Sequence, residues 1–133
     1  MAKSIYKFEV YYGRMGSLQG TFTAEPEDIA FALGKTVYFD EPFGKHSSAQ
    51  PTLAADQFTL VSSDPAEVAT FERLDLSSGD CPLGLLHDSI SDGAIELTEE
   101  EAASAPAYFK DAVANNAERM KRYEEREAHR PPT

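Results

Sequence analysis

The chain has 133 residues, with 23 acidic and 12 basic side chains and a formal net charge of -11 at pH 7. This length is typical of one domain with a core large enough to fold unaided. The surplus of acids argues against direct binding to nucleic acids or anionic membranes, because both depend on Lys and Arg side chains, and it favours a partner with a basic surface.

An antiparallel hairpin is predicted at the start of the chain. Residues 5–12 alternate between apolar and polar side chains, and so do residues 17–23. This period of two is typical of half-buried strands. The segment between them begins and ends with glycine, which favours a tight turn. We expect Phe8 and Phe22 on the buried faces of the two strands.

The next elements predict the fold class. Residues 26–33 and 65–74 are predicted helices, each beginning with a proline beside an acidic residue. Strands are predicted at 36–43 and 56–63, which gives the order β-β-α-β-β-α. We therefore expect an α+β protein: a mostly antiparallel sheet of about four strands built around residues 36–43, two short helices packed on one face, and a long C-terminal helix.

The remainder of the chain is predicted to be mainly helical. Residues 76–97 have little pattern, and Ser77–Asp80 is typical of a turn. Thr98 and Glu101 have the spacing of a capping box, and Pro106 should break or restart the helix. A long helix is then expected from 107 to about 128. We predict an α+β body at 1–97 and a C-terminal helical extension of the same domain at 98–133.

The long helix has a heptad-like row of side chains, a candidate helix interface. The row consists of Phe109, Val113, Asn116, Met120 and Tyr123. Such spacing is typical of a helix–helix seam, although the repeat is short for a coiled coil. We expect the first half of the helix to dock on the sheet and the second half to be exposed. The alternative is that the seam assembles a homo-oligomer or grips a partner, as in a structural or adaptor protein.

Sequence motifs for catalysis, cofactors and metals are weak or fail. Lys35 and Lys45 each follow a glycine, but no glycine stands five positions before either Gly-Lys pair, as a phosphate-binding loop requires. His46 and His87 lack a second nearby histidine, so no metal site is predicted. The single Cys81 excludes an internal disulfide and is better explained as a buried residue than as a nucleophile. We expect a non-enzymatic protein without a cofactor.

A small basic loop remains as a candidate ligand site. Lys45, His46 and Ser47 lie close together, and Arg14 lies in the predicted hairpin turn. Two cations, an imidazole and a hydroxyl could hold an anionic group, and loops carry function disproportionately. This leaves a further alternative, a small ligand-binding domain or enzyme that uses the Lys45-His46 loop.

The preferred hypothesis is a protein-binding module that uses its acidic surface. The acids predicted to contact a partner's Arg and Lys side chains are Glu25, Glu27, Asp28, Asp40, Glu41, Asp56, Asp64 and Glu67. Carboxylates in this role take the place of phosphates, so binding should weaken steeply with salt. A narrower form of the hypothesis is an inhibitor that occupies a basic, nucleic-acid-binding surface of a larger protein.

Composition gives the inhibitor hypothesis its precedent. The chain is small, acidic, poor in cysteine and free of motifs. In these respects it resembles phage proteins that block bacterial defence nucleases, the anti-CRISPR type of anti-defence protein. Neither a signal peptide nor an apolar run long enough to span a bilayer is visible. We therefore expect a cytoplasmic protein, in the host cytoplasm if a phage encodes it.

Overall fold

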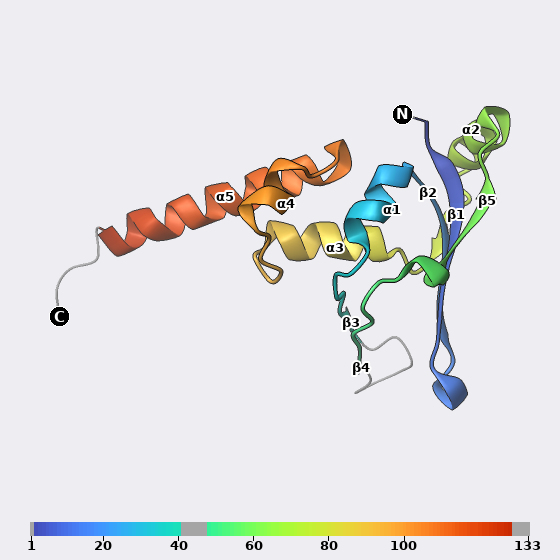
Figure 1. The fold of residues 1–133 in the computed structure, drawn as a ribbon, viewed down its shortest axis with the longest axis horizontal. Coiled ribbons are helices and arrows are strands. Elements are labelled where there is room, and N and C mark those ends of the chain that lie inside the picture. The colour runs from blue at the N-terminus through green and yellow to red at the C-terminus, as the bar shows by residue number, and fades with distance from the viewer. Residues whose placement is uncertain (1, 41–47, 129–133) are drawn as a thin grey trace. The chain divides into compact units, whose positions relative to one another are not determined.

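The computed structural model describes residues 2–40 and 48–128, except for the side chains of Asp40 and Ser48. The protein is α+β, as predicted, with a four-stranded antiparallel sheet in the order β5-β1-β2-β6 and a long C-terminal helix (Figure 1). The strands of this sheet are β1 (Ser4–Tyr11), β2 (Ser17–Ala24), β5 (Phe58–Ser62) and β6 (Ser78–Gly79). The helices are α1 (Pro26–Ala32), α2 (Pro65–Arg73), α3 (Pro82–Ser91), α4 (Glu99–Ala103) and α5 (Ala107–Ala128).

The chain forms two compact units. Unit 1 is Met1–Leu85 and contains the sheet with α1 and α2; unit 2 is Leu86–Thr133 and contains α4 and α5. The division falls within α3. The boundary expected from sequence lay between residues 97 and 98, and the membership of both parts in one domain stays a prediction.

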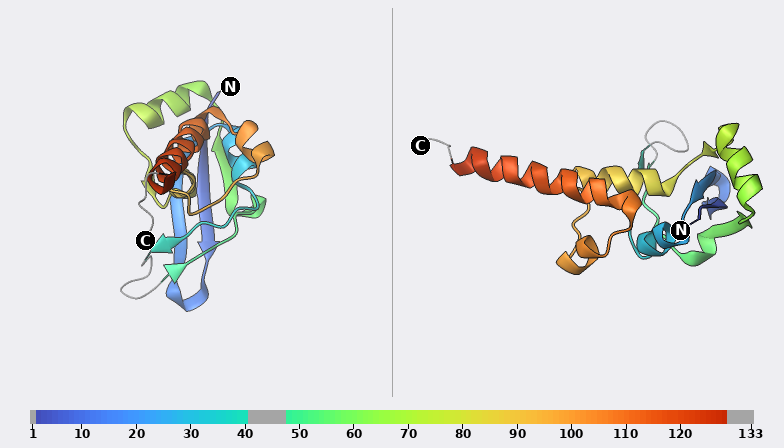
Figure 2. Two further views of the ribbon diagram at one scale, coloured as in Figure 1. Left: turned by 90° about the vertical axis from the view of Figure 1, so that its left-hand side faces the viewer. Right: turned by 90° about the horizontal axis from the view of Figure 1, so that it is seen from above.

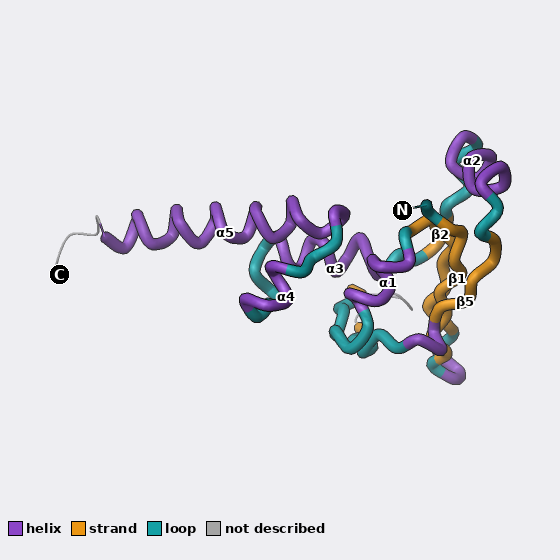
Figure 3. The backbone as a smooth tube through the Cα atoms, turned by 45° about the horizontal axis from the view of Figure 1, so that its top comes forward, coloured by secondary structure: helices purple, strands orange, loops and turns teal. Residues whose placement is uncertain are grey.

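The predicted hairpin is the centre of the sheet. β1 and β2 pair along their whole lengths, with Phe8 opposite Gly20 and Tyr6 opposite Phe22. A short 3-10 turn, Gly13–Met15, joins them. Phe8 and Phe22 are buried, as the alternation predicted. Figure 3 shows the strands β1, β2 and β5 side by side in orange.

Helices cover both faces of this sheet. The Phe8 ring contacts Phe39 and Phe58, with centroids 6.2 Å and 5.3 Å away. On the opposite face of β1, Ile5 forms a buried cluster with Val68 and Phe71 of α2. Figures 1 and 2 show α1 on the Phe8 side and α2 on the other side. The prediction that both short helices pack on one face was therefore wrong.

The described part of the predicted strand 36–43, residues 36–40, is not part of the main sheet. Its extended piece is β3 (Phe39–Asp40), which pairs only with β4 (Ser48–Ala49) among the described residues. Backbone bonds continue this ribbon, since the Val37 N–H donates to the Pro51 carbonyl at 3.0 Å. Val37 and Phe39 are buried. The alternation that suggested a strand arises because the ribbon packs on the sheet through side chains.

The fourth place in the sheet belongs to β6, where a turn was expected. Gly79 lies opposite Gly20 on β2, and the Asp80 N–H donates to the Gln19 carbonyl at 2.7 Å. A Cβ atom on Gly20 would overlap the backbone of Asp80, and one on Gly79 would overlap the Gln19 carbonyl. Glycine at both positions therefore permits this close backbone approach.

Most predicted helix boundaries are confirmed. Asp64 Oδ1 accepts from the Ala66 N–H at 2.8 Å and caps α2. Thr98 and Glu101 form the predicted capping box at α4, with bonds of 3.1 Å and 3.0 Å. Pro106 lies between α4 and α5, so it separates two helices. The helix α3 was not predicted.

Unit 2 is packed at one end of α5 and exposed at the other. Its buried apolar residues are Leu86, Ile90, Ala105, Phe109 and Ala112. Residues 117–128 are all exposed, which agrees with the prediction of an exposed second half. The docking of the first half on the sheet stays a prediction.

Candidate functional site

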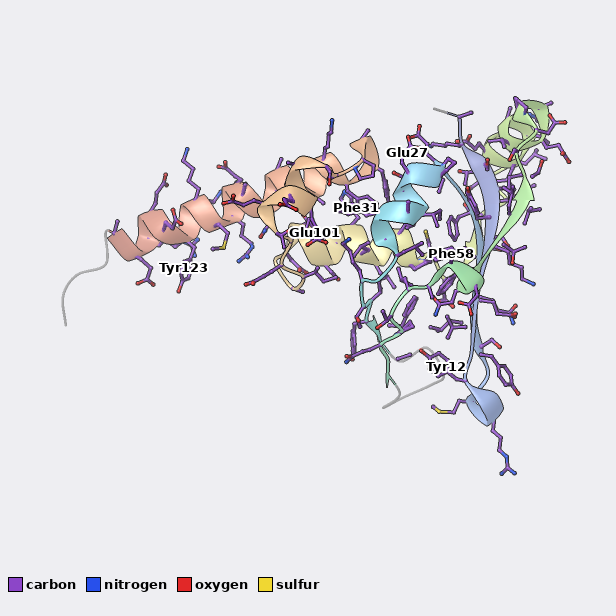
Figure 4. The ribbon with its side chains drawn as sticks, in the orientation of Figure 1. Tyr12, Glu27, Phe31, Phe58, Glu101 and Tyr123 are labelled. Atoms are coloured by element: carbon purple, nitrogen blue, oxygen red, sulfur yellow. The ribbon has the colours of Figure 1, made fainter. Side chains whose placement is uncertain are left out.

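Three of the predicted partner-binding acids lie at the start of α1. Glu25 and Glu27 are partly exposed (Figure 4 labels Glu27), whereas Asp28 is only 4% exposed. The pKa of Glu25 is raised, first by a side-chain hydrogen bond with Glu27, then by desolvation and the nearby charges of Glu27 and Asp28. A carboxylate whose pKa is raised by a neighbouring carboxylate favours the approach of a cation, and Glu25 meets this condition.

Asp28 stabilises the helix instead of facing solvent. The Glu25 N–H donates to Asp28 Oδ2 at 3.2 Å, while Asp28 Oδ1 is buried and has no hydrogen-bond partner. Desolvation raises the pKa of Asp28, and the charge of Glu27 raises it further. In this conformation Asp28 is a capping residue and is not available to a partner.

Replacing Asp28 should change stability in a pH-dependent way. Because the folded pKa of Asp28 lies above its unfolded value, the stability it contributes is complete below about pH 4 and is lost as pH rises through the folded pKa. Asp28→Asn keeps an acceptor for Glu25 and cannot ionise, so its unfolding free energy should exceed that of the wild type at pH 7. Asp28→Ala should lose about 1 kcal/mol at pH 4, because the Glu25 N–H loses its acceptor, and less at pH 7, where the wild type no longer has the stability of the protonated form. Urea unfolding at pH 4 and pH 7 measures both effects. An Asp28→Asn protein less stable than the wild type at pH 7 would contradict the prediction that ionised Asp28 lowers the unfolding free energy at that pH.

Three further predicted acids surround β5. Asp56 is exposed in the 3-10 turn Ala55–Gln57 directly before the strand. Asp64 and Glu67 are exposed after its other end, and Glu67 Oε1 accepts from the Ser62 hydroxyl at 2.8 Å. Ala49–Phe71 contains these three acids and no Lys or Arg. These three acids are close together in sequence and lie at the two ends of one strand.

An apolar groove adjoins this acidic area. It has a volume of about 350 Å³ and is lined by Ile5, Ala66, Glu67, Thr70, Phe71 and Leu76. Ile5 is the neighbour of Ser62 in the sheet, so the groove lies at the end of β5. Sequence reasoning missed the groove, because its lining comes from β1, α2 and the segment after α2.

Several predicted residues lie outside the described part of the chain. Glu41, Lys45, His46 and Ser47 fall in the segment 41–47, and the side chain of Asp40 is also outside the description. Arg14 is exposed in the turn between β1 and β2, near the Tyr12 labelled in Figure 4. The basic-loop site and the Asp40–Glu41 acidic edge therefore stay predictions.

The predicted seam on α5 divides into a packed part and an exposed part. Phe109 is buried, and Val113 and Asn116 are half-buried. Asn116 Oδ1 accepts from Arg119 Nη2 at 3.1 Å. Met120 and Tyr123 are 43% and 57% exposed (Figure 4 labels Tyr123), so these two seam residues remain available for another surface.

His87 forms a polar contact that the sequence did not suggest. Its Nε2 atom lies 3.1 Å from Asp111 Oδ1, and its ring packs against Tyr108 and Phe109. The hydrogen bond from His87 lowers the pKa of Asp111. His87 and Asp111 lie 24 positions apart in sequence. Within unit 2 this contact joins the middle of α3 to the second turn of α5, and it works as a helix–helix link.

The remaining candidates for chemistry in the described residues are Cys81 and groups of metal-ligating side chains. Burial raises the pKa of the Cys81 thiol, against smaller opposing effects of the Leu83 and Gly84 amides, so the reactive thiolate is disfavoured. In residues 2–40 and 48–128, no three His, Cys, Asp or Glu side chains gather as a metal ion would require.

Comparisons with known proteins add no relative: no protein-family model, curated protein or solved structure matches this chain. None of the helices in the described ranges combines the length and apolar character needed to cross a membrane. The surfaces of the chain itself are therefore the basis for proposing a function.

Proposed function

We propose that the protein is a non-enzymatic module that binds another protein through the acidic surface of unit 1. The observation that supports this most directly is the charge around β5. Asp56, Asp64 and Glu67 are exposed there, and no basic residue occurs from Ala49 to Phe71. Carboxylates on such a surface attract Arg and Lys side chains of a partner.

In its narrower form, the proposal is an inhibitor that covers a basic, nucleic-acid-binding surface of a larger protein in the cytoplasm. The net charge of -11 supports this form, because the protein and a nucleic acid would compete for the same cations. An anti-defence protein of the anti-CRISPR type would act in this way.

Neutralising exposed acids should weaken partner binding without unfolding the protein. The variant Glu27→Gln, Asp56→Asn removes two charges from different elements, and neither residue caps a helix through its side chain in the structure. We expect each lost contact to weaken binding by about 1 kcal/mol at low salt and by less at high salt. Glu124→Gln, Glu127→Gln is the matched control, because it removes two charges from the exposed half of α5.

The measurement is affinity capture from a lysate of the encoding organism at low and high salt, followed by a titration of the purified partner against nucleic acid. The proposal predicts a partner that nucleic acid displaces and that the Glu27, Asp56 variant binds more weakly than the control variant does. Retention that depends on neither salt nor these charges would argue against it.

A second candidate function is assembly through α5. The exposed Met120 and Tyr123 favour it, because they continue the seam of Phe109 and Val113 beyond the packed part of unit 2. Sedimentation of the wild type and of Met120→Lys, Tyr123→Lys tests this candidate. It requires an oligomer in the wild type that the double variant dissociates.

A further inference from the structure

The outer edge of β5 has no strand partner among the described residues. β5 is the terminal strand of the sheet, and within the described ranges its only strand partner is β1. Its sequence, Phe58 to Ser62, contains no charged residue and no proline. Natural edge strands usually carry a lysine, a proline or a cover, because free backbone N–H and C=O groups otherwise pair with another chain.

Apolar side chains are exposed along the same edge. Leu60 is 55% exposed and Val61 is 57% exposed, although Phe58 packs against Phe8. The consecutive residues Ile5 and Tyr6 of β1 lie opposite Ser62 and Leu60 of β5. Val61 is therefore the extra residue of a β-bulge. The bulge at Val61 interrupts the ladder on the β1 side, and Phe58–Leu60 pairs with β1 in regular register.

The charges at the two ends of β5 indicate what would pair with it. Asp56 precedes the strand, and Asp64 and Glu67 follow it. In a pair of β5 strands from two copies, either direction would bring acids of one copy beside acids of the other. Of the bases near β5, Lys7 of β1 lies opposite Thr59, and Lys3, which precedes β1, lies 3.7 Å from Glu72. Charge complementarity therefore favours a partner with basic ends over a second copy.

We propose that β5 binds an extended segment of the partner protein as an added antiparallel strand. That segment is apolar at its centre, where it meets Leu60 and Val61, and carries Lys or Arg at both ends, where it meets Asp56, Asp64 and Glu67. The main-chain hydrogen bonds supply affinity, and the flanking charges and the groove beside Ser62 supply specificity. This inference rests on the proposed function and specifies where and how the partner binds.

A synthetic peptide tests the inference directly. The probe contains alternating Val and Thr residues between pairs of lysines. One control peptide keeps the lysines around a Gly-Ser centre, and the other keeps the Val-Thr centre between glutamates. We expect the probe to slow amide exchange in Phe58–Ser62 about tenfold and to bind about tenfold more tightly than either control.

Substitutions on the protein provide the second arm of the test. Val61→Lys should weaken probe binding about tenfold, because a lysine on an edge strand opposes strand addition. Met15→Lys is the matched control: Met15 is also 57% exposed and the charge change is identical, but it lies in the turn between β1 and β2. We expect it to change binding less than about twofold. Thr59→Lys, at another exposed position of β5, should repeat the Val61→Lys result.

The outcomes separate this inference from the proposed function. If the Gly-Ser peptide binds as tightly as the probe, the acidic surface binds cations and the strand-addition inference fails. The inference also fails if Val61→Lys and Met15→Lys behave alike, or if sedimentation shows a dimer that Val61→Lys dissociates. If no basic peptide and no cellular partner binds, the proposed function fails as well.

Discussion

Gly20→Ala is expected to detach β6 from the sheet and to lower the free energy of unfolding by about 2 to 4 kcal/mol. A methyl group at Gly20 would overlap the backbone of Asp80, which cannot rotate away as a flexible side chain could. The two strands must separate, and the bond from the Asp80 N–H to the Gln19 carbonyl, 2.7 Å long, is then lost. Urea unfolding measures the loss, and the exchange rate of the Asp80 amide reports the separation.

Substitutions at two other glycines separate the cost of steric overlap from the cost of backbone strain. Gly34 has a φ of +86° with open space around the added methyl group, so Gly34→Ala should cost only the backbone strain, about 1 kcal/mol. Gly79 combines a φ of +71° with an overlap on the Gln19 carbonyl, so Gly79→Ala should be at least as costly as Gly20→Ala. If Gly20→Ala and Gly34→Ala lower the unfolding free energy equally, the pairing of β6 with β2 does not require the close backbone contact at Gly20.

Phe8→Ala is expected to cost about 3 to 5 kcal/mol, a large part of the stability of a small domain. Phe8 is fully buried, and its ring contacts Phe58 of the sheet and Phe39 of the β3–β4 ribbon. The cavity left behind would therefore weaken both the sheet and the attachment of the ribbon. Thermal or urea unfolding measures the cost.

The control for Phe8 comes from the same strand. Tyr11 is 77% exposed on β1, so Tyr11→Ala should change the unfolding free energy by less than about 0.5 kcal/mol. Fluorescence and circular dichroism should give coincident transitions if the sheet and ribbon unfold together. A cost below about 1 kcal/mol for Phe8→Ala would mean that the Phe8 cluster is not the main support of unit 1.

The sequence predicted the elements whose signals are local. The hairpin follows from a strict alternation around Phe8 and Phe22, and α2 follows from Asp64 and its proline. The helix α3 carries Leu83, Leu86 and Ile90 at helical spacing, and all three are buried. That signal was weakened by Gly84, a poor helix former, and by the turn residues on each side.

Tertiary relations were harder to predict because they depend on which surfaces meet. The alternation at Val37 and Phe39 is the same for a strand inside a sheet and for a ribbon packed on one. The prediction of a strand within the main sheet was therefore wrong. The pairing of Gly20 with Gly79 joins residues far apart in sequence, and neither glycine alone indicates a strand.

The same distinction applies to the candidate surfaces. The predicted strand 56–63 already placed Asp56, Asp64 and Glu67 at its ends, but the position of this strand at the edge of the sheet could not be predicted from the sequence. Asp28 was counted among the surface acids, because a sequence does not distinguish a buried capping carboxylate from an exposed one.

The exposed half of α5 has a consequence for how freely this segment can vary. Residues 117–128 are all exposed in the described chain, and a helix of this length in water is only marginally stable on its own. The ion pair between Glu118 and Arg122, with a 3.7 Å separation, adds only a few tenths of a kcal/mol. The segment is therefore in helix–coil equilibrium, and proteases that cut after Lys or Arg should trim it first. Because these residues add no buried side chain to the described core, we expect the requirements on their sequence to come mainly from solubility or from a binding partner.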